Sequence, residues 1–318
     1  MTVTAEAPSR RRFFRLLLSS ANDPRVLVIA WLNLIANVVI IATGGTVRLT
    51  GSGLGCDQWP GCTTTSFLPG IDDGIHGFIE FGNRTLSGLL AILAILAVLS
   101  VWRLRRERRD LWVHAWIILG GVLVQALIGM IVVFSGLAMS TVGIHYFLSA
   151  ALVGVATSFV IRVRRSPGLR GRAVPLWMFV VTHVTTLLMA GVVILGIFTT
   201  GSGPHSGDED VIRDSSDWEQ LAHTHAWLGY MLAAALVVLL IGAMTMRQTR
   251  YLGAVIAVVI VVAVQITVGI VQARLGLPPL LVGVHMVLAA VSVAVTVVLL
   301  DSLKTMVPAA GTENPANA

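Results

Sequence analysis

Residues 280–300 read LLVGVHMVLAAVSVAVTVVLL and contain no charged side chain. An α-helix rises about 1.5 Å per residue, so about 20 such residues cross the hydrocarbon core of a bilayer. This length and composition predict a transmembrane helix. Its one ionisable group, His285, is costly to place in lipid and therefore indicates a polar neighbour, a partner side chain or a cofactor.

Seven other stretches have the same character. The expected spans are 26–47, 77–101, 111–134, 142–161, 175–198, 220–245, 252–272 and 280–300. Hydrophobic residues make up 56% of the chain and charged residues 12%, about half the charged share of a soluble domain. We therefore predict an all-α polytopic membrane protein with eight transmembrane helices. The first span lacks a clear cleavage site and is expected to stay as a helix.

Basic residues gather between the apolar runs, mostly on one side. Of the 22 Lys and Arg residues, 18 fall on the side that an eight-span chain shares with its two termini. The positive-inside rule places that side in the cytoplasm, so we expect a multi-pass protein of the plasma membrane with both termini cytoplasmic. Membrane lipid is then its surrounding. Nucleic-acid binding is not expected, because the basic residues form short blocks between spans.

The chain also repeats itself. A shift of 140 in residue number places Gln125 on Gln265, Gly129 on Gly269, Gly136 on Gly276, Leu137 on Leu277, Gly143 on Gly283 and His145 on His285. A shift of 150 places 50–53 on 200–203, both reading TGSG. Two four-helix units with an even number of crossings must run parallel, about an axis along the membrane normal.

This repeat divides the chain into two pseudo-symmetric four-helix bundles with flanking segments. The expected parts are a cytoplasmic N-terminal segment 1–25, an N-terminal half 26–161, a cytoplasmic linker 162–174, a C-terminal half 175–300 and a disordered cytoplasmic tail 301–318.

His145 and His285 occupy equivalent positions, each preceded by Val-Gly-Ile or Val-Gly-Val. One such histidine would be read as structural, but two in register favour a shared ligand role. The same shift also places Asn83 on His223, at a depth similar to that of His285. Two imidazoles from neighbouring helices can hold one low-spin haem. His225 competes with His223, but it lies about 200° further around the helix, so both cannot reach one iron. The repeat register favours His223.

The first copy departs from this symmetry, because Asn83 stands where a second histidine would be expected. Glu80 lies one turn before it, and His76 lies four residues before Glu80, on the same helical face if the helix extends that far. Glu80 could be the ion-pair partner of Arg84, or a carboxylate beside a less saturated iron. Both interpretations stay open.

Cys56 and Cys62 lie in an expected outer loop and are spaced so that a local disulfide is geometrically possible. Such a bond could be a structural staple or could exchange with thiols. Metal binding is less favoured, because no CxxC spacing is present. The remaining histidines are assigned to structure: His114, His183 and His205.

Over residues 26–300 the sequence resembles the haem A synthases of aerobic respiration. The resemblance is carried by TGGTVRLTGSGLGC at 43–56, Trp59-Pro60-x-Cys62, Ile79-Glu80-x-x-Asn83-Arg84, and the histidines at 145, 223 and 285. It implies oxidation of the C8 methyl group of haem O to a formyl group, which gives haem A for cytochrome oxidase.

The resemblance also implies roles for residues. His223 and His285 would hold haem b in the C-terminal half. The N-terminal half would take the substrate haem, with Glu80 in the chemistry and a Cys56–Cys62 disulfide outside. The usual first-half motif is Glu-x-x-His-Arg, so Asn83 leaves His145 as the strong ligand unless His76 moves in. Arg84 would pair with a haem propionate or anchor the helix at the interface.

Haem O and the haem O synthase that supplies it are the expected partners. The electron donor, quinol-linked or otherwise, and homo-oligomerisation stay open. An alternative is a bis-His membrane cytochrome b that passes electrons without modifying haem; it needs both sites saturated, and Asn83 counts against this. A transporter of parallel repeats would have helices broken near the midplane, whereas the polar residues here lie near the outer face.

Overall fold

The computed structural model describes residues 23–203, 207, 217–246 and 249–306. Its long helices are α2 (Pro24–Leu49), α3 (Gly74–Val101), α4 (Arg109–Phe134), α5 (Met139–Val163), α6 (Leu176–Ser202), α7 (Trp218–Thr245), α8 (Thr249–Arg274) and α9 (Pro279–Ser302). Short elements are the 3₁₀ turns η1 (Ile71–Asp73) and η2 (Trp102–Arg105) and the strands β1 (Arg170–Arg172) and β2 (Lys304–Met306).

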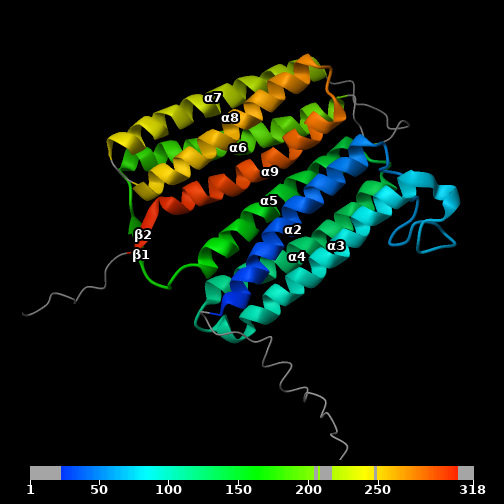
Figure 1. The fold of residues 1–318 in the computed structure, drawn as a ribbon, viewed down its shortest axis with the longest axis horizontal. Coiled ribbons are helices and arrows are strands. Elements are labelled where there is room, and N and C mark those ends of the chain that lie inside the picture. Colours follow the sequence, from blue (N-terminus) through cyan, green and yellow to red (C-terminus); the bar gives the residue numbers. More distant parts are fainter. Residues whose placement is uncertain (1–22, 204–206, 208–216, 247–248, 307–318) are drawn as a thin grey trace, which may run out of the picture.

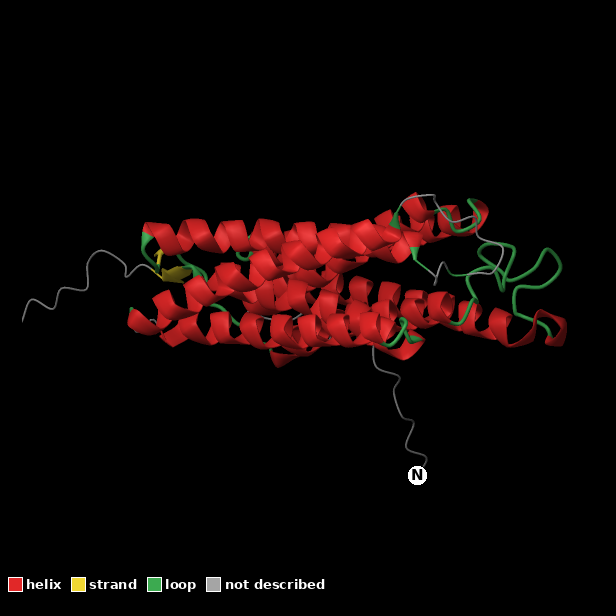
Figure 2. Ribbon diagram, turned by 90° about the horizontal axis from the view of Figure 1, so that it is seen from above, coloured by secondary structure: helices red, strands yellow, loops and turns green. Residues whose placement is uncertain are grey.

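All eight long helices of the described chain are long and apolar enough to cross a membrane. Figure 2 shows them running side by side along one direction. Large apolar side chains lie on their outer faces, such as Leu187 at 72% and Leu123 at 55% exposure. Such faces are stable in lipid but not in water. The predicted all-α membrane protein of eight spans is confirmed.

Each half of the chain has its own hydrophobic core, and the halves lie beside one another (Figure 1). The core of α2–α5 includes Ala30, Val98, Ile118 and Phe159. The core of α6–α9 includes Met178, Leu236, Val258 and Leu299. Small and β-branched residues are frequent in these cores, which lets the helix backbones approach closely.

The α4–α5 and α8–α9 turns have the same backbone conformation. Gly136 and Leu137 have positive φ angles of 59° and 57°, and Gly276 and Leu277 have 75° and 61°. In each turn the leucine N–H donates to the carbonyl five residues earlier, at 3.0 and 2.8 Å. A leucine in the left-handed region is uncommon, so its occurrence at both positions supports a structural duplication.

The seam between the halves is formed by α2 and α5 against α9, with α5 also against α6. Glycines make the close contacts in both directions. A Cβ atom at Gly143 of α5 would lie 2.9 Å from Ile197 of α6, and one at Gly283 of α9 would lie 3.1 Å from Leu49 of α2. These two glycines are equivalent in the sequence repeat, so the seam itself follows the repeat.

The basic linker folds onto the end of α9, at the end of the molecule opposite the disulfide loop (Figure 1). Strand β1 pairs antiparallel with β2, with Arg170 opposite Met306. The Asp301 carboxylate pairs with Arg165, Arg170 and Arg250. Burial and the neighbouring arginines lower the pKa of Arg165 to about 10, so it is still protonated at neutral pH.

This arrangement differs from the expected disordered tail 301–318. Asp301 still belongs to α9, and 304–306 form a strand, because one carboxylate gathers three arginines at this point. Residues 307–318 lie outside the described residues.

Candidate functional site

In the C-terminal half, α7 and α9 bring two histidine side chains together. The ring centres of His225 and His285 are 6.2 Å apart, and the ring planes are inclined by 71°. The Nδ1 atom of His225 lies 3.0 Å from the Val192 carbonyl oxygen. A carbonyl only accepts, so Nδ1 of His225 donates and Nε2 is left as the metal-binding nitrogen.

Glycines of the neighbouring helices make room for both rings. A Cβ atom at Gly196 of α6 would lie 3.1 Å from Cε1 of His225. One at Gly269 of α8 would lie 3.1 Å from Cε1 of His285. A larger residue at either position would push an imidazole out of place, so the glycines help to set where the nitrogens point.

The structure brings His225, not His223, to His285. His223 is exposed on α7. The repeat register predicted His223 because a single shift of 140 was applied to the whole half. Asn83 packs near Gly44 of α2, at 4.0 Å from a Cβ built there, as His225 packs on Gly196 of α6. Asn83 and His225 therefore both face the first helix of their own half.

In the N-terminal half, His145 of α5 repeats the surroundings of His285. Gln125 Nε2 donates to the His145 carbonyl at 2.9 Å, and Gln265 Nε2 donates to the His285 carbonyl at 3.0 Å. Gly129 faces Cε1 of His145 at 3.6 Å, as Gly269 faces His285. The two histidines thus occupy equivalent positions in space as well as in sequence.

Asn83 of α3 differs from a histidine in what it can offer. Its Oδ1 accepts a hydrogen bond from Thr43 Oγ1 at 2.8 Å. This bond leaves the Nδ2 group as a donor. An amide N–H donates a hydrogen bond and cannot ligate a metal ion as an imidazole can, so Asn83 offers the N-terminal half a donor and not a metal ligand.

His76 lies in the first turn of α3, at the end of the bundle that carries the disulfide loop, and is exposed. Its Nδ1 lies 2.8 Å from Ser52 Oγ, which is itself 2.7 Å from Thr50 Oγ1. These contacts tie His76 to the outer end of α2, one turn outward from Glu80.

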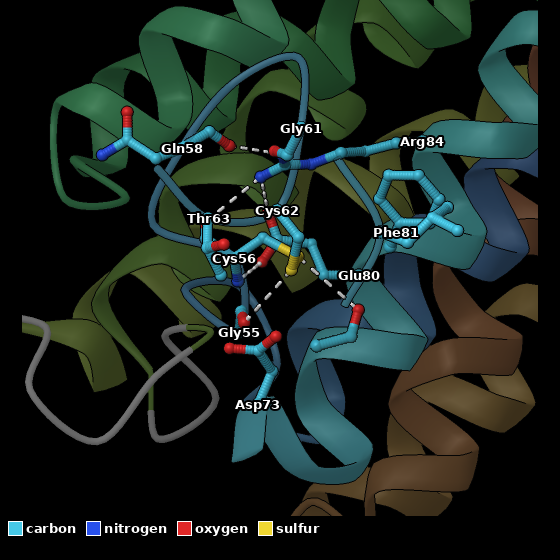
Figure 3. Close-up of a disulfide and its surroundings, with 12 residues drawn as sticks. Gly55, Cys56, Gln58, Gly61, Cys62, Thr63, Asp73, Glu80, Phe81 and Arg84 are labelled. Atoms are coloured by element: carbon cyan, nitrogen blue, oxygen red, sulfur yellow. Dashed lines mark hydrogen bonds and ion pairs between the residues drawn. A yellow bond between two sulfur atoms is a disulfide. The ribbon is translucent and has the colours of Figure 1, made fainter. Parts of the chain in front are cut away.

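The outer loop is closed by a disulfide between Cys56 and Cys62, whose Cα atoms are 4.4 Å apart (Figure 3). The predicted local bond is confirmed. Both cysteines are buried. Gly55 lets the loop backbone lie on the first turn of α3, because a Cβ there would come within 2.4 Å of the His76 backbone.

Glu80 and Arg84 of α3 contact this loop (Figure 3). Glu80 is buried, its Oε2 accepts from the Cys56 N–H at 2.7 Å, and its Oε1 pairs with Arg84. The Arg84 guanidinium also donates to the carbonyls of Gln58 at 2.5 Å, Gly61 at 2.6 Å and Cys56 at 3.2 Å. The ion-pair interpretation of Glu80 is therefore what the structure displays, and Arg84 is directed at the loop.

The profile of the family COX15-CtaA, described as a cytochrome oxidase assembly protein, matches residues 27–297. The chain belongs to this family. Similar proteins named heme A synthase include those of Geobacillus kaustophilus, 31% identical over 137 residues, and Bacillus licheniformis, 32% identical over 133 residues. The matched part covers 42% of this chain in both cases, and 42% and 43% of those relatives. It thus spans about two fifths of the relatives' length.

In this COX15-CtaA protein, the C-terminal histidine pair has the geometry for one shared metal ion. An imidazole nitrogen binds a transition metal at about 2.0 Å and the ring centre lies roughly 1.1 Å behind it, so two opposed rings sharing an ion have centres about 6 Å apart. The observed 6.2 Å fits this distance. His225 and His285 are therefore the two imidazoles that would hold an iron ion between them. His145 is the equivalent histidine in the other half.

The other histidines of this family member make structural contacts. His114 Nδ1 is 2.7 Å from the Asp110 carbonyl, and its Nε2 accepts from Arg162 Nε at 3.1 Å. His183 donates from Nδ1 to the Phe179 carbonyl at 2.8 Å. The His183 and Phe179 rings are also in contact, with centres 4.3 Å apart. His205 lies outside the described residues.

Proposed function

We propose that the protein is a haem A synthase, which oxidises the C8 methyl group of haem O to a formyl group and so supplies haem A for cytochrome oxidase. Family membership and the names of the similar proteins support this. The observation that carries the proposal is the unequal pair of histidine positions. In the C-terminal half, the His285 ring lies beside the His225 ring. In the N-terminal half, we take Asn83 to stand where a second imidazole would be needed to face His145.

The C-terminal half is the electron-transfer site in this proposal. His225 and His285 hold haem b, which supplies one-electron transfer when bound. The protein keeps the two nitrogens in place through the Val192 carbonyl on one side and the glycines of α6 and α8. An iron with both axial positions filled is suited to passing electrons and not to binding oxygen.

The N-terminal half is the substrate site. His145 ligates the haem O iron on one side, and Asn83 leaves the other side open. Conversion of a methyl to a formyl group removes four electrons in two two-electron steps and adds one oxygen atom. With water as the source of that oxygen, four protons and four electrons leave the site and need an electron acceptor. The donor group of Asn83, fixed by Thr43, can orient a polar group on the open side of the substrate.

Glu80 and Arg84 serve this site by holding its outer wall. Their ion pair fixes the loop that carries Cys56 and Cys62, and this loop lies over the outer end of α3. The contribution of Glu80 to the oxidation is then to keep the loop closed above the substrate and to provide a buried carboxylate near it. His76 and Ser52 fix the same region from the side of α2.

The proposed setting is the plasma membrane, with both termini in the cytoplasm. The arginine-rich linker and the β1–β2 strands lie at one end of the helices and the disulfide loop at the other (Figure 1). The positive-inside rule then places the strands inside and the disulfide in the oxidising exterior. Haem O from a haem O synthase would enter from the membrane.

Pigment extraction tests the proposal. The protein is co-expressed with a haem O synthase in a host that makes no haem A, and the extracted haems are separated by chromatography. We expect haem A with the wild-type protein. The Glu80→Ala variant is expected to keep haem b and to accumulate haem O or a hydroxylated intermediate. Bound haem b with unmodified haem O in the wild-type preparation would support the electron-passing cytochrome instead.

A further inference from the structure

We propose that Gln265 and Gln125 are positioning residues for the axial histidines, each accepting the Nδ1–H of the histidine whose backbone it already binds. In the C-terminal half the pair is Gln265 with His285, and in the N-terminal half it is Gln125 with His145. This inference rests on the proposed function, since it concerns the haem-bound form.

The orientation of each glutamine amide is fixed by its observed hydrogen bond. Gln265 Nε2 donates to the His285 carbonyl, and Gln125 Nε2 donates to the His145 carbonyl. A carbonyl oxygen cannot donate, so the nitrogen must face it and Oε1 must face elsewhere. Among the described residues, Oε1 of both glutamines is buried and has no hydrogen-bond partner. Each half thus has one buried glutamine Oε1 that accepts no hydrogen bond from the described residues.

The matching donor lies on the histidine ring. Nδ1 of His145 and Nδ1 of His285 are also buried without a hydrogen-bond partner in the part of the chain that the structure describes. When Nε2 ligates iron, the neutral imidazole must carry its proton on Nδ1. A buried N–H without an acceptor is unfavourable. A histidine that ligates a metal almost always donates its other N–H to a neighbouring group.

His225 shows what the other two histidines lack. Its Nδ1 already has an acceptor, the Val192 carbonyl at 3.0 Å. The backbone of Gln265 also approaches the His285 ring, so the side chain and the main chain of this residue are the two acceptors near that Nδ1–H. The glutamine side chain is the buried acceptor attached to the same histidine in both halves. Gly269 and Gly129, one turn after each glutamine, lie against Cε1 of the ring.

The surroundings of the two glutamine–histidine pairs are the same in both halves, so chance is a poor explanation for them. The hydrogen bond, the unpartnered acceptor, the unpartnered donor and the glycine all recur at equivalent positions of the two halves. One difference separates the halves. Gln125 is also bonded to Ser149 Oγ, whereas Ala289 occupies that place in the second half. The Gln265 side chain therefore makes fewer hydrogen bonds than that of Gln125, and a substitution there disturbs fewer other contacts.

The experiment compares the haem b reduction potential of the full-length protein with those of Gln265→Leu and Gln265→Glu. A stronger acceptor at Nδ1 makes the imidazole more basic and stabilises the oxidised iron. We expect Gln265→Glu to lower the potential and Gln265→Leu to raise it, with about tenfold weaker haem binding in the leucine variant. Gln272→Leu is the matched control on α8, because its Oε1 is also buried and unpartnered among the described residues. It should keep the wild-type potential.

The potential is read by redox titration of the low-spin optical bands, with electron paramagnetic resonance of the oxidised protein as a second signal. Equal potentials in the wild type and both Gln265 variants would overturn the inference and leave the role to the backbone carbonyl. Shifts of both variants in one direction would overturn it as well. A wild-type protein that binds no haem, or a His285→Ala variant that keeps the low-spin signal, would instead overturn the proposed function.

Discussion

Arg84→Leu is the sharpest test of how the outer loop is held. In the structure this guanidinium pairs with Glu80 and donates to three loop carbonyls, and the two side chains are only 15% and 7% exposed. The substitution removes the cation that pairs with the buried Glu80 carboxylate and the donor to the three loop carbonyls. Removing one partner of a buried ion pair costs about 3–5 kcal/mol. We expect the loop around the disulfide to open locally while the transmembrane core stays folded.

The magnitude can be read as hydrogen exchange. The Cys56 amide is protected by its bond to Glu80 Oε2 at 2.7 Å, and this acceptor is held by Arg84. Because about 1.4 kcal/mol corresponds to a tenfold change in an equilibrium constant, a loss of about 3 kcal/mol or more predicts exchange of this amide at least about a hundredfold faster. The assay is hydrogen–deuterium exchange with mass spectrometry on the purified protein.

Two controls make this prediction sharp. Arg84→Lys keeps the positive charge but loses the planar fork that reaches several carbonyls, so an intermediate effect is expected. Arg105→Leu removes an exposed arginine at the other end of the helix bundle, where it donates to one carbonyl, and should leave the Cys56 amide unchanged. Wild-type exchange at Cys56 in Arg84→Leu would refute the idea that this ion pair holds the loop.

Three further predictions concern the histidines of the proposed haem sites and the Asp301 cluster. His225→Ala should lose the low-spin haem b bands while His223→Ala keeps them, as measured by reduced-minus-oxidised spectra; the reverse result would restore the assignment given by the repeat register. Gly269→Ala should lower haem b content, because the new Cβ would lie 3.1 Å from Cε1 of His285. Gly129→Ala should be tolerated, because its Cβ would lie 3.6 Å from Cε1 of His145. Equal haem content in the two variants would contradict the idea that Gly269 makes room for the imidazole ring. Asp301→Ala should destabilise the protein by about 1–3 kcal/mol, because it leaves three arginines without their shared carboxylate; thermal unfolding in detergent measures this, and an unchanged midpoint would show that the cluster adds nothing.

The sequence predicted the fold because its signals are local. Each span is a run of apolar residues long enough to cross a bilayer, and such a run needs no partner to be recognised. The helices extend the predicted spans by a few residues, for example Pro24–Leu49 against 26–47. This extension occurs where polar interfacial residues continue the helix. The duplication was also visible, because the same spacing between glutamine, glycine and histidine is present in both copies.

The ligand set was predicted only in part. His145 and His285 followed from the repeat, but His225 did not, because the shift between copies changes from 150 at the first helix to 140 at the last. Because the shift changes along the chain, a helix between the first and the last need not follow a shift of either 150 or 140. Placing Asn83 on His225 needs a shift of 142, and each of these side chains faces a glycine of the first helix of its half. Spacing along one helix could not show which of two histidines faces α9.

Hydrophobic length, basic blocks and the internal repeat thus determined the number of helices, their expected orientation and the pairing of the halves, since each is written in neighbouring residues. Tertiary structure decided which side chains meet. Only the folded bundle brought the His225 ring beside His285. Only the folded disulfide loop joined Glu80 and Arg84 to Cys56. Only the approach of the linker and of α8 to the end of α9 gave Asp301 its three arginines. These contacts join residues far apart in the chain, and their geometry depends on helix rotation and loop length, which local composition does not encode.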